Sequence, residues 1–225
     1  MPDRLWLDFK FRRRVREQIK ASGPWYQQQQ LLPFLWTRPW TQATIGELIH
    51  AERGGPKWRR FILPLIKPYL KGAVVVELGT NAAHNLVLAL RAGAERGIGI
   101  EPDPRYFKQA MLVRQCRGLQ RTLTIVQSFT EAAVLARVQF PGFRAELGLI
   151  CAVLRHVPES QRALSLRMMG DLCRRILICG NGLPDAPDGD SIQSILRDVE
   201  RANMQVEELR SEPHVRGLRI LVRAK

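Results

Sequence analysis

Two glutamates stand at the ends of short apolar runs and could carry the chemistry of this chain. Glu77 follows Val74-Val75-Val76, and Glu101 follows Gly97-Ile98-Gly99-Ile100. Such runs predict buried parallel strands, and Leu86 to Arg91 predicts the helical crossover between them. In an open α/β sheet, ligands bind at the carboxyl ends of the strands, where the strand order reverses. An acid at that edge can accept the hydroxyl protons of a ribose, so the pair predicts a nucleoside ligand.

The turn after Glu77 distinguishes between nucleoside cofactors. A dinucleotide fingerprint needs G-x-G-x-x-G, which lets the backbone approach a pyrophosphate at a helix N-terminus. Only Gly79 is present here. Asn81, Ala83 and His84 fill the rest of the turn. Glu77 would repel a diphosphate but attract a ligand that carries an ammonium and a sulfonium, so the residues favour S-adenosylmethionine.

This arrangement resembles the class I S-adenosylmethionine-dependent methyltransferases over roughly residues 57 to 225. The first motif of that family runs acid-x-Gly-x-Gly-x-Gly, which Glu77 and Gly79 begin and in which Asn81 and Ala83 replace later glycines. The resemblance implies S-adenosylmethionine as cofactor and methyl transfer as reaction. It places Glu77 and Gly79 at the methionine end, with Asn81 in the same turn, and Glu101 on the ribose.

The predicted third strand, Leu123 to Val126, is followed by Gln127, Ser128 and Phe129. In the family that this chain resembles, adenine is met at this position, where an amide or a hydroxyl can satisfy its exocyclic amine. The resemblance therefore implies Gln127 and Ser128 as cofactor contacts. For Phe129, stacking on the adenine ring and ordinary core packing are both open.

The predicted fourth strand, Leu147 to Val153, leads into Leu154-Arg155-His156. This segment is similar to the branch related to the tRNA wobble-uridine carboxymethyltransferases and small-molecule methyltransferases, where Leu-Tyr-His follows strand four. Arg155 replaces the tyrosine and His156 is retained. Because an imidazole titrates near neutral pH, His156 is the first candidate for a catalytic base and His84 the second. The alternative for His156 is a helix cap, and a carboxylate acceptor would need neither histidine.

The elements predict an α/β fold: a Rossmann-like, seven-stranded, mostly parallel sheet with an antiparallel terminal hairpin, helices on both faces and a helical N-terminal leader. The remaining predicted strands are Arg174 to Gly180, Gln205 to Arg210 and Arg216 to Val222, and the remaining predicted helices are Asp8 to Ala21, Thr44 to Ala51, Lys57 to Leu70, Arg105 to Cys116 and Ser191 to Asn203. We expect two parts: a basic, tryptophan-rich leader or lid over residues 1–56, and a cofactor-binding domain over residues 57–225.

The leader combines aromatic residues and charge. Trp25, Trp36 and Trp40 are separated by prolines, which predicts an irregular segment that packs on the main domain and caps a pocket. The glutamine run at residues 27–30 is expected to form a surface helix or turn. Residues 1–72 hold 14 of the 35 Lys and Arg residues and only 5 of the 21 acids, which favours a polyanion contact. An arginine-rich composition is the alternative explanation, since 28 of the 35 are Arg.

Composition excludes several other classes. The net charge is +14, and no apolar run approaches the roughly 18 residues of a membrane span. Four cysteines without C-x-x-C spacing predict reduced thiols in the cytoplasm and no metal site. The acceptor is expected to be a small molecule or RNA, and the oligomeric state is left open. A non-catalytic cofactor-binding module and an RNA-binding partner protein are the two alternatives to an enzyme.

Overall fold

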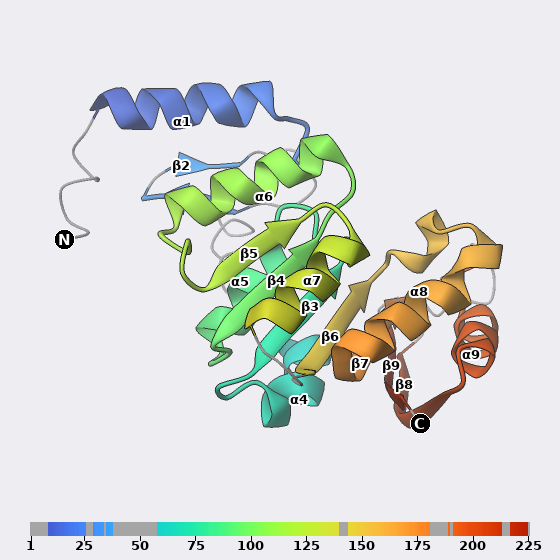
Figure 1. Ribbon diagram of the computed structural model, residues 1–225. Helices are drawn as coiled ribbons and strands as arrows, with labels where there is room; N and C mark the ends of the chain where they lie inside the picture. The colour runs from blue at the N-terminus through green and yellow to red at the C-terminus, as the bar shows by residue number, and fades with distance from the viewer. Residues whose placement is uncertain are drawn as a thin grey trace.

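A seven-stranded sheet forms the centre of the protein (Figure 1). The computed structural model describes residues 9–25, 29–33, 35–37, 58–139, 144–180, 189, 191–212 and 217–224. The strands run in the order β5-β4-β3-β6-β7-β9-β8, with bounds β3 Val74–Leu78, β4 Arg96–Ile100, β5 Leu123–Val126, β6 Ala145–Cys151, β7 Cys173–Gly180, β8 Met204–Glu212 and β9 Gly217–Ala224. Strands β5, β4, β3, β6 and β7 are parallel, and β9 is antiparallel to both β7 and β8. The predicted Rossmann-like sheet is confirmed.

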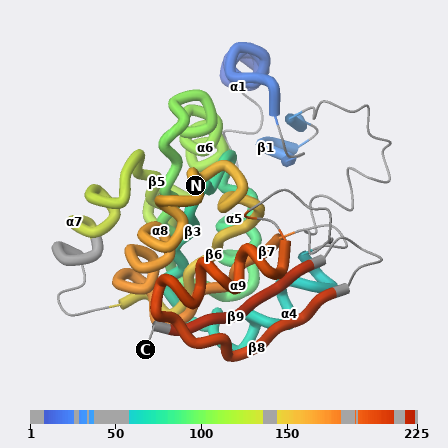
Figure 2. The backbone as a smooth tube through the Cα atoms, turned by 90° about the vertical axis from the view of Figure 1, so that its right-hand side faces the viewer, coloured from blue at the N-terminus to red at the C-terminus, as the bar shows by residue number. Residues whose placement is uncertain are grey.

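Helices cover both faces of this sheet (Figures 1 and 2). They are α5 His84–Arg91, α6 Pro104–Cys116, α7 Phe129–Gln139, α8 Glu159–Leu172 and α9 Ile192–Arg201, with a short 3-10 turn η3 at Leu154–His156. One apolar core includes Val76, Leu166 and Ile195 and lies on the α7, α8 and α9 side. The other includes Val75, Leu86 and Ala110 and lies on the α5 and α6 side. Alternate residues of β3 serve both cores, so its uninterrupted apolar run is the expected pattern for a strand covered on both faces.

The helical segment before β3 is irregular. It consists of a π-helix η1 at Trp58–Ile62, α4 at Leu63–Ile66 and a 3-10 turn η2 at Lys67–Tyr69. Proline interrupts the backbone hydrogen-bond ladder because it lacks an N–H, which accounts for the breaks near Pro64 and Pro68. The helical segment expected from Lys57 to Leu70, with a break or a start at Pro64 and an end near Pro68, is thus three short pieces.

The leader packs on the outer side of α5 and α6. Helix α1, Phe9–Ala21, lies along α6 in both views (Figures 1 and 2). Trp25 is buried and donates from Nε1 to the carbonyl of Ile19 at 2.9 Å. The segment that follows forms a small antiparallel pair, β1 Gln30–Leu32 and β2 Leu35–Trp36. The tryptophan segment was expected to lack regular structure, so this pair corrects that expectation.

Three further expectations differ from the structure or fall outside the described residues. The glutamine run was expected at the surface, yet Gln29 is 1% exposed, because the β1–β2 pair carries it into contact with the main domain. The predicted helix at Thr44 to Ala51, together with Trp40 and Lys57, lies outside the described residues. Strand β6 ends at Cys151, two residues before the predicted end, because Ala152 turns into the left-handed region with φ 57°.

We predict that Gly99→Ala destabilises the protein by about 1–3 kcal/mol. A Cβ at Gly99 would lie 2.6 Å from Thr80 Cγ2 and 2.9 Å from Ile125 Cδ1, which is too close without a shift of β4 or of the turn after β3. The control is Gly97→Ala in the same strand, whose Cβ would lie 3.2 Å from Cδ1 of Leu123, its nearest neighbour. Denaturant unfolding measures both variants, and equal stability of the two would contradict this packing account.

Candidate active site

The strand order reverses between β3 and β6, because β4 and β5 continue on one side of β3 and β6 lies on the other. In parallel α/β sheets, this reversal opens a crevice at the carboxyl ends of the strands. Glu77 is the next-to-last residue of β3, and Glu101 directly follows β4. The two predicted acids therefore meet at the same edge, beside the reversal.

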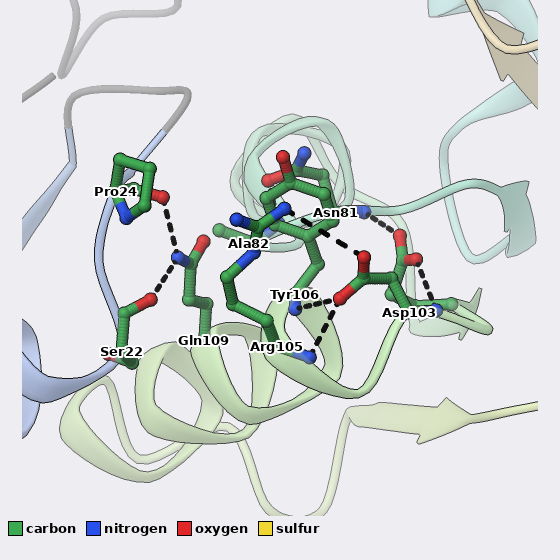
Figure 3. A network of polar contacts seen from close by, with 9 residues as sticks. Ser22, Pro24, Asn81, Ala82, Asp103, Arg105, Tyr106 and Gln109 are labelled. Atoms are coloured by element: carbon green, nitrogen blue, oxygen red, sulfur yellow. Dashed lines mark hydrogen bonds and ion pairs between the residues drawn. The ribbon is translucent and has the colours of Figure 1, made fainter. Parts of the chain in front are cut away.

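Glu101 is held between the backbone amides of Asn81 and Asp103, and these two residues are labelled in Figure 3. Its Oε2 accepts from the Asn81 amide at 2.7 Å, and its Oε1 accepts from the Asp103 amide at 3.0 Å. Burial raises the pKa of Glu101 above its ordinary value, and these two amides act in the opposite direction. Each carboxylate oxygen accepts one hydrogen bond here and retains a further lone pair. The arrangement can therefore accept from a vicinal diol.

Glu77 lies deeper, at 2% exposure. Thr80 Oγ1 lies 2.7 Å from its Oε2, and Asn85 Nδ2 donates to its Oε1 at 2.7 Å. Burial is the largest cause that raises the pKa of Glu77 to about 8, and the contacts with Asn85 and Thr80 lower it. A cationic ligand nearby would favour the ionised form. The hydrogen bonds of Glu77 with Thr80 and Asn85 connect the first turn to α5. The charge state of Glu77 can also respond to a bound cation.

The turn after β3 has an unusual backbone. Gly79, Asn81 and Ala83 have φ values of 66°, 52° and 58°, in the left-handed region. Glycine takes this region freely and asparagine tolerates it, whereas alanine is rarely found there. Asn81 and Ala83, which replace glycines of the methyltransferase motif, thus keep the backbone conformation of glycine although they carry side chains. This conformation places the Asn81 amide on Glu101.

Gly79 also makes room for the segment after β6. A Cβ at this position would lie 2.5 Å from Cγ2 of Val153. The Val153 side chain therefore lies against the backbone of the first turn, at the reversal of the strand order. Sequence reasoning found the need for a glycine here but missed this packing reason for it.

The residues expected near adenine lie at the end of β5 and the start of α7. Gln127 is exposed, and its backbone N–H donates to Glu131 Oε2 at 2.7 Å. Ser128 Oγ accepts from the Glu131 amide at 3.2 Å, as an N-terminal helix cap does. Phe129 is half-buried and packs on the core that contains Val76. Both contacts of Gln127 and Ser128 leave further hydrogen-bonding groups of their side chains for a ligand.

His156 lies at the end of η3, after β6, and is exposed. Arg155 Nε donates to His156 Nε2 at 3.1 Å. That nitrogen is the acceptor in this contact, so a neutral His156 carries its proton on Nδ1. The structure does not show the helix-cap alternative, because α8 begins after Pro158 without a side-chain cap. His84 is the first residue of α5 and is half-buried beside the first turn.

Arg162 in α8 organises the loop that carries His156, and the sequence analysis did not find it. Its Nε donates to the carbonyl of Leu154 at 3.0 Å and to that of Val157 at 2.9 Å. The side chain is 6% exposed, so it bridges two main-chain groups from below the loop surface. The sequence alone does not show that Arg162 is buried, so its contacts with these two carbonyls become apparent only in the fold.

Other features of the described residues lie away from this edge. A cavity of about 490 Å³ is lined by β1, α5 and the segment after α6, with Leu31, Val87 and Leu119 among its residues, and neither glutamate lines it. Within the described ranges, no three His, Cys, Asp or Glu side chains gather as metal ligands. Among the helices that the structure describes, none has the length and apolarity to cross a membrane.

Comparisons with known proteins agree on the fold. The N-terminal domain of EvdMO1, with bound S-adenosylhomocysteine, superposes with a TM-score of 0.61 at 15% identity and covers 95% of this chain and 97% of its own. Mitomycin 7-O-methyltransferase MmcR gives 0.57 at 18% identity, with 80% of this chain and 57% of that chain covered. Magnesium protoporphyrin IX methyltransferase from Synechocystis PCC 6803, with bound S-adenosylmethionine, gives 0.53 at 14% identity, covering 72% and 74%.

At the sequence level the likeness is shorter. A stretch of 70 residues is 33% identical to the tRNA U34 carboxymethyltransferase of Cellvibrio japonicus and makes up 31% of this chain and 21% of that protein. The chain thus spans about a fifth of the length of the curated relative it matches. No family model matches the chain. Together with the sheet order and its antiparallel C-terminal strands, these comparisons establish the class I methyltransferase fold.

The raised pKa of Glu77 predicts a pH dependence of stability. The folded-state pKa of about 8 lies above the ordinary 4.5, so the folded state binds this proton more tightly than the unfolded state does. The stabilisation of the folded state by this proton is complete below about pH 4.5 and is lost as pH rises toward 8. The free energy of unfolding therefore falls by several kcal/mol across this window. Denaturant unfolding of Glu77→Gln across this window should show a flatter profile than wild type, and parallel profiles would contradict the assignment.

Proposed function

We propose that this protein is an S-adenosylmethionine-dependent methyltransferase. The observation that carries the proposal is the buried Glu101, which presents two carboxylate oxygens at the carboxyl edge beside the reversal of strand order. A ribose diol matches this acceptor pair, and the chain lacks the glycine pattern that a dinucleotide requires. The methyltransferase neighbours with bound S-adenosylmethionine or S-adenosylhomocysteine support the same cofactor for this fold.

In this proposal each part of the edge has one task. Glu101 holds the ribose, the turn of Gly79 and Asn81 receives the methionine end with Glu77 beneath it, and Gln127 with Ser128 contacts adenine. When bound, the cofactor supplies an electrophilic methyl group. The chain holds cofactor and acceptor in line and at contact distance, and this positioning provides most of the rate without a covalent intermediate. Exclusion of water from the edge strengthens each polar contact.

We propose His156 as the group that accepts or orients the acceptor proton. It follows β6 at the catalytic edge and its ring is exposed, so an acceptor can reach it. The contact with Arg155 occupies Nε2, so acceptor binding must displace Arg155 before this nitrogen can take a proton. His84 beside the first turn is the second candidate, and a carboxylate acceptor would require neither base.

We propose a leader of residues 1–56 and a methyltransferase domain of residues 57–225 as the two working parts. The leader would act as a lid and contact the acceptor, which we propose to be a small molecule or RNA. The basic helix α1 supports a polyanion contact, because Arg14, Arg16 and Lys20 are exposed and only Glu17 opposes them on this helix. The four free cysteines fit a reducing cytoplasm.

A non-catalytic cofactor-binding or RNA-binding partner protein is the second candidate. The observation in its favour is the first turn, where Asn81 and Ala83 adopt left-handed backbone angles without glycine. The hydrogen bond from Arg155 to His156 also favours this candidate, because it occupies the ring nitrogen that would accept a proton. Cofactor binding without turnover on RNA, protein and metabolite extracts would support this candidate.

Glu101→Ala should weaken S-adenosylmethionine binding by about 1.5–3 kcal/mol, which is roughly 10- to 150-fold, because it removes charge-assisted hydrogen bonds to the ribose. The control is Glu95→Ala, an exposed acid directly before β4, at the end of the strand opposite to Glu101, that pairs only with Arg96 at 3.7 Å among the ion pairs of the described residues. Calorimetric titration gives both affinities. Unchanged affinity in Glu101→Ala would contradict the proposal that Glu101 binds the ribose.

The polyanion contact predicts a local charge effect. Replacing Arg14, Arg16 and Lys20 by Gln should weaken RNA binding and lower the salt slope of log K by about 2–3, because each phosphate that a cation neutralises contributes roughly 0.7–0.9. The control removes an equal charge from the other end of the protein, with Arg174, Arg201 and Arg210 changed to Gln. Gel-shift titrations at several salt concentrations test this, and the same slope for both triple variants would refute a specific role for α1.

A further inference from the structure

Gln29 connects the leader to the turn after β3. The side chain is 1% exposed, and its Nε2 donates to the carbonyl of Ala82 at 2.9 Å, across 53 residues of sequence. Its backbone is fixed by Thr37, since the Gln29 N–H donates to Thr37 Oγ1 at 2.8 Å and the Thr37 N–H donates to the Gln29 carbonyl at 2.9 Å. The amide is therefore aimed at the turn by the β1–β2 pair.

The bonded carbonyl belongs to the residue between the two left-handed positions. Asn81 and Ala83 flank Ala82, and neither is glycine. The Ala82 side chain is fully buried in an apolar cluster formed largely by the leader, with Val15, Ile19, Trp25, Leu31, Leu32, Leu35, Val87, Leu112 and Val113. The leader thus contacts the turn through one polar and one apolar interaction. Both restrict a backbone that alanine at position 83 would not favour by itself.

A second buried amide fixes the leader from the other side (Figure 3). Gln109 of α6 is fully buried, and its Nε2 donates to the carbonyls of Ser22 at 2.5 Å and Pro24 at 2.9 Å. Helix α6 begins after Glu101, where Asp103 accepts from the amides of Arg105 and Tyr106. The leader is therefore bound both to the turn and to the helix, and Glu101 is bonded to residues at the start of each.

We infer that Gln29 is a positioning residue for the cofactor site: it holds the Asn81–Ala83 turn in the form that places the Asn81 amide on Glu101. The inference rests on the proposed function for the identity of the ligand, but its effect on the turn does not. Leader docking and cofactor binding are then linked, and linkage is reciprocal. The leader substitutes for the glycines that the first motif lacks.

The test replaces Gln29 by methionine, which has similar length and no donor. In Gln29→Met without cofactor, amide hydrogen exchange should rise in the peptide that covers residues 79–90. The affinity for S-adenosylhomocysteine should fall about tenfold, within the usual range of coupling between sites. Gln193→Met on the exposed face of α9 is the matched control and should change neither quantity.

Ala83→Gly provides the decisive arm, because glycine takes the left-handed conformation without the help of the leader. Alone it should preserve or improve affinity, and added to Gln29→Met it should restore most of the lost affinity. Unchanged exchange in residues 79–90, or additive effects of the two changes, would overturn the inference. If Gln29→Met does not fold, Gln29→Asn takes its place with the same readouts. Failure of the wild type to bind the ligand would refute the proposed function, and the exchange measurement would still decide the role of Gln29.

Discussion

Two carboxyl groups buried at one edge of the sheet set the requirements for everything around them. Burial disfavours the charged form and raises the pKa of both Glu77 and Glu101. Each group therefore needs hydrogen-bond donors from neighbouring elements. Thr80 and Asn85 form hydrogen bonds with Glu77, and the backbone amides of Asn81 and Asp103 donate to Glu101. The shape of the first turn, the start of α5 and the start of α6 follow from these contacts.

The first turn meets this requirement with few glycines. Three alternate residues take left-handed backbone angles, and only Gly79 does so without a side chain. At Gly79 the missing side chain gives room to Val153 after β6, so the turn and the loop before His156 are in contact. Packing therefore joins the turn to the loop after β6, and Arg162 fixes the main chain on both sides of His156.

Much of this edge is predictable from the sequence because its signals are local. The apolar run of β3 and the acids at its end and after β4 predict both the strands and the ligand edge, since successive parallel strands end at the same side. The antiparallel pair β8 and β9 is equally visible as alternating residues near the C-terminus.

The missed features depend on contacts between distant segments. Gln29 reads as part of a polar run, but the β1–β2 pair buries it against Ala82. Arg162 reads as one more surface arginine, although two carbonyls hold it below the loop. The contact of Arg155 with His156 likewise needs the geometry of η3. Polar residues in buried roles give no periodic signal, so their partners appear only in the folded chain.

Calorimetric titration of the full chain with S-adenosylmethionine and with NAD most directly tests whether this edge binds S-adenosylmethionine. Each titration is carried out in two buffers of different ionisation enthalpy, which reports proton release. The account predicts one saturable site for S-adenosylmethionine, none for NAD, and proton release near neutral pH, because the cationic ligand favours ionised Glu77. Absence of saturable S-adenosylmethionine binding, or binding of NAD at the same site, would contradict it.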